Sequence, residues 1–305
     1  MILVWGDRSD APVEHVLALL QQRQAAVMHI DGARLADLRH DLTLGGTGPA
    51  ITTGWIESQG LRADVQQLTG IYLRPLPAPP GAAAQAAAAA ADVLLTLTAN
   101  TSAVVINPPA AGLSNHSKPF QLQLIARAGL AVPPTLITSD AQAALDFVQL
   151  HGRVVYKSIS GVRSVVSTLE IKDQLRLQGL AHGPVQLQRW VAGRDVRVHV
   201  VGRRCFATAI DCQATDYRYA ARSGEPVQLS PMRIAPALAK TLVGLVHGLG
   251  LQLAGVDLRQ TPTGDWVCFE VNPSPGFTYC EDATGQPIGD ALVDLLLRVR
   301  TRPSS

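Results

Sequence analysis

The most constraining feature of the sequence is a pair of alternating runs, 255–259 and 266–272, around a turn-forming Pro/Thr/Gly/Asp segment at 260–265. This pattern predicts a β-hairpin. With the turn centred on Thr263 and Gly264, the register pairs Val256 with Val271 and Leu258 with Phe269 on one face. The other face then pairs Asp257 with Glu270 and Gly255 with Asn272.

Two carboxylates directly opposite each other repel, so a cation between them would resolve the arrangement. Asp257, Glu270 and Asn272 offer hard oxygen ligands, which suit Mg²⁺ better than zinc. Two alternatives stay open: the face is solvated, or its carboxylates pair with Arg259. A one-residue error in register would also separate the carboxylates.

Composition bounds the class of protein. With 305 residues, 47% hydrophobic and 16% charged, the chain folds as two domains or one multi-lobed unit. A net charge of +2 gives no reason to expect nucleic acid or a membrane as partner. The four cysteines lack metal or disulfide spacing, and no secretion signal is evident, so we expect free thiols and a cytoplasmic protein. The four lysines are Lys118, Lys157, Lys172 and Lys240.

The order of elements predicts an α+β fold with separate sheets. A β-α-β pattern opens the chain, an alanine-rich helix is expected over 81–98, and a boundary falls near residue 107. Further helices are expected over 117–129, 141–150 and 234–249, with strands at 132–137, 154–158, 165–169, 186–191, 196–201 and 205–211. The glycine-rich stretch 45–49 is interpreted as a plain turn.

The run Glu270-Val271-Asn272-Pro273-Ser274-Pro275-Gly276, with Asp257 upstream, resembles the magnesium motif of ATP-grasp ligases. The resemblance covers roughly residues 107–298. Its other parts follow in the family's order: Asn115 to Lys118, Val154 to Lys157, Gln186 to Val191 and Asp195 to Arg197.

The resemblance implies ATP and Mg²⁺ as cofactors, with two metal ions and Mn²⁺ as an alternative. Lys118 and Lys157 would contact phosphates. Gln188, Arg189 and Val191 lie in the hinge segment, where the backbone of Arg189 and Val191 would bind adenine. Asp195 would lie near the ribose, Arg197 would face phosphate as a catalytic cation, and the metals would be held by Asp257, Glu270 and Asn272.

Within the superfamily, three stretches resemble the ribosomal-protein glutamate ligase branch and peptide macrocyclases of the microviridin or graspetide type: 133–140, 211–218 and 281–288. Arg218 in the second stretch is a second candidate catalytic cation. The loop 158–164 has one glycine where many relatives have several, and Arg189 stands where relatives often have Glu.

We therefore expect an N-terminal α/β domain over 1–106, a central subdomain over 107–190, and a C-terminal subdomain over 191–305 that holds the metal site. The expected reaction is ATP-dependent joining of a carboxylate to an amine or hydroxyl through an acyl phosphate. The substrate would be a peptide. Two alternatives stay open: a ligase for a free amino acid such as glutamate, and an ATP-binding protein without turnover. A homo-oligomer also stays open, and His199 is interpreted as an ordinary buried histidine rather than a base.

Overall fold

A computed structural model describes residues 1–45, 51–76, 81, 83–157, 167–169, 185–212 and 226–298. The N-terminal unit contains a parallel sheet in the order β2-β1-β6-β7. Its strands and helices are β1 (Ile2–Gly6), α1 (Ala11–Gln22), β2 (Val27–Ile30), β6 (Gly70–Arg74), α2 (Ala84–Ala99) and β7 (Val104–Ile106). The predicted opening β-α-β unit and the alanine-rich helix are confirmed.

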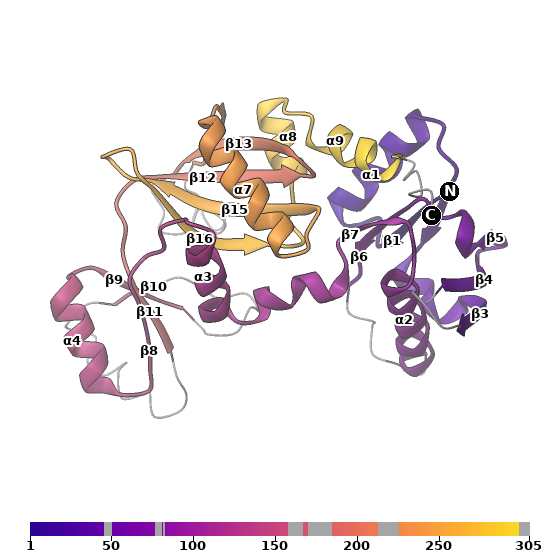
Figure 1. Ribbon diagram of the computed structural model, residues 1–305, viewed down its shortest axis with the longest axis horizontal. Helices are drawn as coiled ribbons and strands as arrows, with labels where there is room; N and C mark the ends of the chain where they lie inside the picture. Colours follow the sequence, from indigo (N-terminus) through magenta and orange to yellow (C-terminus); the bar gives the residue numbers. More distant parts are fainter. Residues whose placement is uncertain are drawn as a thin grey trace.

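A small antiparallel meander in the order β3-β4-β5 lies beside this sheet (Figure 1). It consists of β3 (Arg39–Gly45), β4 (Ile51–Ser58) and β5 (Leu61–Asp64), flanked by the 3-10 helices η1 (Gly32–Asp37) and η2 (Val65–Gln67). The sequence indicated only two short β-like pieces here. The predicted turn at 45–49 falls almost entirely outside the described residues.

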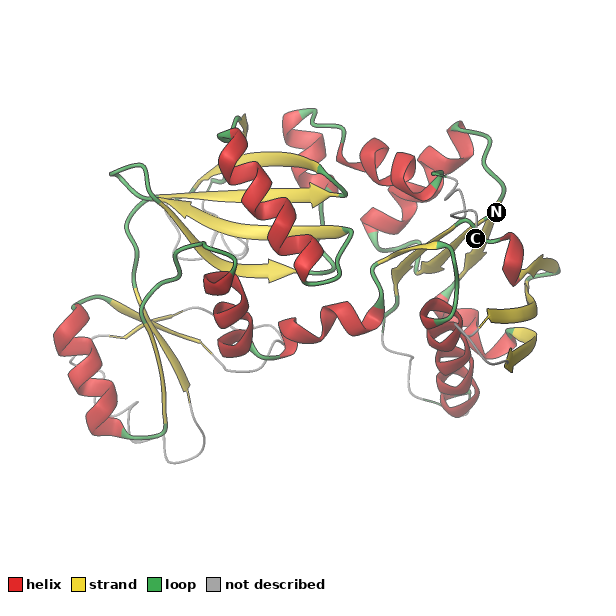
Figure 2. Ribbon diagram, viewed as in Figure 1, coloured by secondary structure: helices red, strands yellow, loops and turns green. Residues whose placement is uncertain are grey.

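The chain then crosses to the other units through η3 (Pro109–His116) and α3 (Lys118–Arg127). The central unit is an antiparallel sheet in the order β10-β9-β11-β8, with α4 packed on it (Figure 2). Its elements are β8 (Thr135–Thr138), α4 (Ala141–His151), β9 (Val154–Lys157), β10 (Ser167–Leu169) and β11 (Val185–Arg189). β8 lies at the edge of this sheet, where prolines directly before a strand are tolerated.

The C-terminal unit is an antiparallel five-stranded sheet in the order β14-β13-β12-β15-β16. Its elements are β12 (Arg194–Val201), β13 (Arg204–Asp211), β14 (Gln228–Met232), α7 (Pro236–Gly248), β15 (Leu253–Gln260) and β16 (Trp266–Asn272). Helix α7 covers one face, where Val196, Val198 and Val256 are buried together with Leu242 of the helix. The opposite face carries the polar residues discussed below. The prediction of an α+β fold with separate sheets is confirmed.

The last two helices return toward the start of the chain. Helix α8 (Thr278–Thr284) leads to α9 (Ile288–Leu296), whose Leu292 is buried in one cluster with Val16 and Leu20 of α1. Arg23 binds Asp290 and Asp294 of α9 at 2.7 and 3.2 Å. Helix α9 therefore packs on the N-terminal unit (Figure 1).

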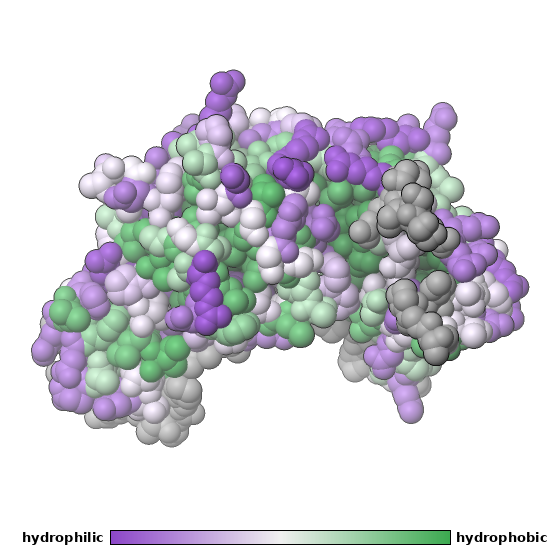
Figure 3. All heavy atoms as spheres, in the orientation of Figure 1, coloured by the Kyte–Doolittle hydropathy of each residue, from purple (hydrophilic) through white to green (hydrophobic). Residues whose placement is uncertain are grey.

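On the face shown in Figure 3, hydrophilic and hydrophobic residues are intermixed, which fits the small net charge of +2. None of the four cysteines forms a disulfide bond. Among the described residues, we find no helix with the length and apolar character that crossing a membrane requires.

Candidate active site

One row of side chains crosses four strands of the C-terminal sheet. Thr208, Arg197, Asp257 and Glu270 are successive register partners on β13, β12, β15 and β16. Because directly paired residues project to the same face, the row lies on the face opposite α7. The predicted facing of Asp257 and Glu270, and of Gly255 and Asn272, is confirmed.

The predicted pairing of Leu258 with Phe269 is wrong, because Leu258 pairs with Cys268. The register between the two strands shifts at a β-bulge: Asp257 pairs with Glu270 and the next residue, Leu258, pairs with Cys268, so Phe269 lies between the two pairs. The turn closes one residue earlier than expected, through Thr261 N–H donating to Asp265 O at 2.9 Å. The bulge adds one residue, Phe269, and so restores the register before the polar row begins. Asp257 and Glu270 therefore share a face although the turn end of the hairpin is shifted.

Arg197 forms an ion pair with Asp257 through its Nη1 atom. The Arg197 side chain is 7% exposed, and it lies against Gly255, where a Cβ atom would come within 2.8 Å of the guanidinium. Glycine at 255 thus makes room for the arginine. The sequence left open an ion pair between Asp257 and Arg259, but Asp257 does not pair with Arg259. Arg259 instead binds Asp195 at 2.7 Å.

Lys118 binds the other carboxylate: its Nζ lies 3.2 Å from Glu270 Oε1, with side chains 10% and 18% exposed. Ser117 caps α3 by accepting a hydrogen bond from the backbone N–H of Phe120. One turn further along α3, Gln121 donates to Val271 O at 2.8 Å and accepts from Val271 N at 2.9 Å. This two-bond contact fixes α3 on edge strand β16 and so holds Lys118 beside Glu270.

The charges along the row run from Arg197 through Asp257 and Glu270 to Lys118, so the two cations flank a central pair of carboxylates. Asn272 lies one register step away, and its Oδ1 accepts from Ser274 N at 2.9 Å. Two carboxylates and an amide oxygen are the donors that Mg²⁺ prefers, and a cation between the carboxylates would offset their repulsion. Among the described residues, no group of three or more His, Cys, Asp and Glu side chains is placed to hold a metal ion.

The hinge residues lie at the end of β11. Gln188 is buried, and its Nε2 lies 3.2 Å from Thr135 Oγ1. Arg189 N donates to Pro134 O at 2.9 Å, and Val191 O accepts from Arg259 Nη1 at 2.8 Å. These two backbone groups are engaged within the protein, so adenine binding would use the other backbone groups of Arg189 and Val191.

Two predicted residues are described incompletely or not at all. Lys157 ends β9, and its backbone is the register partner of Gln186; its side chain is not described. Arg218, the loop 158–164 and Lys172 lie outside the described residues. The structure therefore brings together the metal set, Arg197 and Lys118, and places Asp195 further along the same sheet face, against Arg259.

His199 follows Arg197 on the same face of β12 and is fully buried. Its Nε2 lies 3.2 Å from Gly276 O, which can only accept a hydrogen bond, so Nε2 carries the proton. Burial, followed by the positive charge of Arg197, lowers the pKa of His199 from 6.5 to about 3. The imidazole is therefore neutral at ordinary pH.

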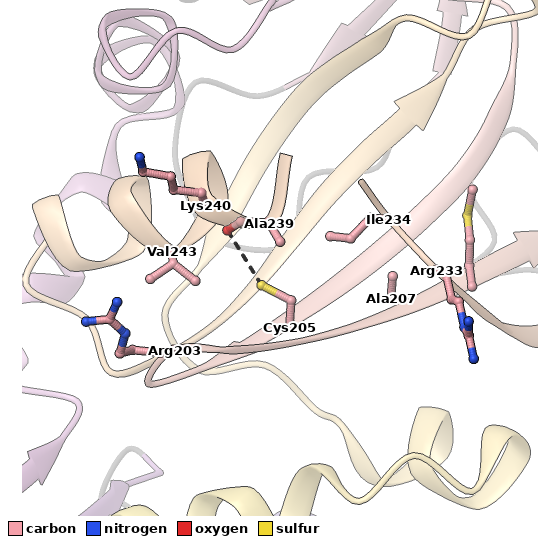
Figure 4. A pocket seen from close by; sticks show the side chains of 9 residues that line it. Arg203, Cys205, Ala207, Arg233, Ile234, Ala239, Lys240 and Val243 are labelled. Atoms are coloured by element: carbon pink, nitrogen blue, oxygen red, sulfur yellow. Dashed lines mark hydrogen bonds between the residues drawn. The ribbon is translucent and has the colours of Figure 1, made fainter. Parts of the chain in front are cut away.

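Two cavities border the sheet. One of about 590 Å³ is lined by Asp195, Asp211 and Cys212, at the point where β13 ends. Another of about 470 Å³ lies on the α7 face, where Cys205 Sγ donates to Ala239 O of the helix at 3.8 Å (Figure 4). Burial raises the pKa of the Cys205 thiol to about 11, so the thiol is protonated and unreactive. None of the predicted site residues lines this second cavity.

Two sheets joined by a hinge strand, with flanking cations and facing carboxylates on one sheet, are the architecture of an ATP-grasp protein. The RimK-like ATP-grasp domain matches residues 115–296, and the chain belongs to this family. The match begins at Asn115 and ends in α9, so it includes the whole row described above.

Comparisons with individual proteins agree with this assignment. A probable alpha-L-glutamate ligase of Pseudoalteromonas translucida (strain TAC 125) is 28% identical over 63% of this chain, and the match spans 66% of that relative's length. The solved structure of the ATP-grasp ligase PsnB with a minimal precursor is similar, with a TM-score of 0.79, 26% identity and 97% of each chain covered. The macrocyclase MdnC of Microcystis aeruginosa MRC, bound to the precursor peptide MdnA, has the same fold, with a TM-score of 0.79, 21% identity, and 98% of this chain and 100% of that chain covered.

Proposed function

We propose that the protein is an ATP-dependent ligase that joins a carboxylate to an amine or hydroxyl of a peptide substrate. The observation that carries the proposal is the row of Asp257 and Glu270 flanked by Arg197 and Lys118. In the proposed reaction, the terminal phosphoryl group of ATP is transferred to the substrate carboxylate, giving ADP and an acyl phosphate. The amine or hydroxyl then attacks the acyl carbon, an amide or ester forms, and phosphate leaves.

Each described residue has a role in this scheme. Asp257, Glu270 and Asn272 would hold Mg²⁺, which supplies charge neutralisation for the phosphate oxygens when it is bound. Arg197 and Lys118 would turn part of their hydrogen-bonding capacity toward phosphate, because both already lie beside the metal ligands. Lys157 and Arg218 are proposed as further phosphate-facing cations, and Gln188, Arg189, Val191 and Asp195 as the adenine and ribose side of the site.

Peptide substrates are favoured by the two solved relatives, one complexed with a minimal precursor and one bound to a precursor peptide. A second candidate is addition of free glutamate to a protein or peptide terminus. It is supported by the names of the curated relatives, which are called probable alpha-L-glutamate ligases. Both candidate reactions activate a carboxylate as an acyl phosphate. They differ only in the nucleophile that attacks it: an amine or hydroxyl of the peptide in the first, and the amine of free glutamate in the second.

One experiment separates these possibilities. Purified protein is incubated with ATP, Mg²⁺ and a synthetic peptide that contains Glu together with Ser, Thr and Lys, with or without free glutamate. ADP formation and peptide mass are followed together. Loss of one water per ADP supports the peptide ligase, and a gain of one glutamyl residue supports the amino-acid ligase. The Glu270→Gln variant is the matched control, because it keeps side-chain size but loses a metal-binding charge.

Full activity of Glu270→Gln would overturn the metal assignment. The third possibility, a nucleotide-binding protein without turnover, makes a different prediction. The protein would bind ADP but would form no ADP from ATP with acidic peptides rich in Ser and Thr, with acidic peptides rich in Lys, or with glutamate.

A further inference from the structure

The segment Pro273 to Gly276 leaves the sheet directly after the metal-ligand candidate Asn272, and three of its carbonyls are bound from three different elements. Asn107, which follows β7, donates to Pro273 O at 2.5 Å. Arg74, the last residue of β6, donates to Pro275 O at 2.9 Å. His199 of β12 donates to Gly276 O at 3.2 Å. The segment is therefore held by side chains rather than by strand pairing.

Arg74 belongs to the N-terminal unit and Asn107 directly follows its last strand, β7, whereas none of the residues of the polar row comes from that unit. Asn107 also accepts from the backbone of Gln252 and Leu253 at 2.8 and 3.0 Å, so it ties the end of β7 to the start of β15. Asn107 therefore has a structural task of its own, whereas Arg74 reaches only the segment after the metal ligands and its own unit.

The guanidinium of Arg74 is bound on both sides. Its Nε and Nη2 lie 2.5 and 3.3 Å from the carboxylate of Asp10, the residue that precedes α1. Its Nη1 lies 3.0 Å from Ser274 Oγ in addition to Pro275 O. The Arg74 and Asp10 side chains are 12% and 20% exposed. Because a guanidinium is planar and its donors have fixed directions, these contacts fix Ser274 and Pro275 relative to β6 and α1.

Ser274 passes this restraint to the metal site, because its N–H donates to Asn272 Oδ1 at 2.9 Å. That hydrogen bond directs the amide of Asn272, and Glu270 lies two residues earlier on the same face of β16. A residue that restrains Ser274 therefore also restrains the orientation of Asn272, one of the three metal-ligand candidates.

We propose that Arg74 is a positioning residue for the metal site, through which the N-terminal unit sets the geometry of Asn272. This inference rests on the proposed function, since it presupposes that the row binds a divalent cation. Removal of a residue that orients a metal ligand typically lowers the metal affinity by about 10- to 100-fold. Loss of Arg74 therefore weakens divalent-cation binding at this site by about tenfold, and it leaves metal-free ADP binding unchanged.

The test measures Mn²⁺ binding directly, by the loss of the free-Mn²⁺ signal in electron paramagnetic resonance, with ADP present and no turnover. Arg74→Met is compared with wild type and with Arg23→Met. Arg23 is a matched control, because it also belongs to the N-terminal unit and pairs with two carboxylates, but on α9, away from the hairpin. Arg74→Met is expected to raise the Mn²⁺ dissociation constant about tenfold, whereas Arg23→Met is expected to leave it unchanged.

Arg74→Lys gives the deciding result if Arg74→Met does not fold. Lysine keeps a positive charge beside Asp10, but a single ammonium cannot span Asp10, Ser274 and Pro275, so Mn²⁺ binding again weakens. Wild-type Mn²⁺ affinity in a folded Arg74→Met or Arg74→Lys protein would overturn the inference. An equal loss of Mn²⁺ affinity in Arg23→Met would also overturn the inference, because the effect of Arg74→Met would then reflect a general disturbance of packing in the N-terminal unit. Absence of Mn²⁺ binding in wild type would instead refute the proposed function.

Discussion

The two faces of the five-stranded sheet use the same strands for different purposes. On the α7 face of β12, Val196, Val198 and Val200 are at most 1% exposed, and burial of each such side chain contributes about 1.5–3 kcal/mol to stability. On the other face, Arg197 and His199 occupy the intervening positions. Neighbouring residues of one strand thus serve the apolar core and the candidate site in turn. A substitution on the apolar face should lower stability without changing nucleotide binding, and a substitution on the polar face should lower the rate of ADP formation.

The largest effect is expected on the polar face, for Lys118→Met. This change removes the ammonium beside Glu270 and leaves two facing carboxylates with one cation. ADP formation at saturating ATP should fall about 100-fold, the lower end for loss of one group that stabilises transition-state charge. Lys240→Met, at an exposed position of α7, is the matched control and should keep the wild-type rate.

A wild-type rate of ADP formation in folded Lys118→Met would show that the ion pair with Glu270 is structural. In that case, the polar face would owe its catalytic charge to other residues.

On the apolar face, Val198→Ala should lower the free energy of unfolding by about 2 kcal/mol, because it removes two buried methyl groups and leaves a cavity under α7. Urea denaturation measures the loss, and calorimetric titration should find ADP affinity unchanged. Val227→Ala is the control, because Val227 is 37% exposed and should cost less than about 0.5 kcal/mol. A tenfold loss of ADP affinity in folded Val198→Ala would mean that the two faces are coupled.

The hairpin shows what local pattern could predict. Alternation along 255–259 and 266–272 was sufficient to place Asp257 opposite Glu270. It could not predict how the turn closes, since that depends on the Thr261–Asp265 backbone bond, nor that Phe269 bulges out and stacks near Arg259 at 5.3 Å. The two deviations cancel before the polar row, so the predicted pairing of Asp257 with Glu270 is confirmed although the predicted turn register is wrong.

Longer-range contacts were beyond local pattern. The sequence predicted a helix over 117–129, which includes α3, and the resemblance to ATP-grasp ligases pointed to Lys118. Nothing near Gln121 or Arg74 indicates their partners, which lie 150 and 200 residues away along the chain. Such contacts depend on how whole units pack, and a single sequence does not display that.

The smallest effect concerns His199, which lies on the polar face but is buried as completely as the valines. Its pKa is about 3 in the folded protein against 6.5 when it is unperturbed, because burial and Arg197 disfavour the charged ring. The folded state therefore binds this proton less readily than the unfolded state. The corresponding stability is fully present above pH 6.5 and is lost as pH falls toward 3.

His199→Gln tests this directly, because the glutamine amide can donate to Gly276 O but does not titrate. In metal-free buffer, lowering pH from 8 to 5.5 should cost wild type about 1.4 kcal/mol more unfolding free energy than it costs the variant. Urea denaturation at both pH values gives the difference, and carboxylates common to both proteins cancel. If the unfolding free energies of wild type and variant change in parallel with pH, His199 is hydrated and titrates normally. The polar face would then be less completely shielded from water than the apolar face.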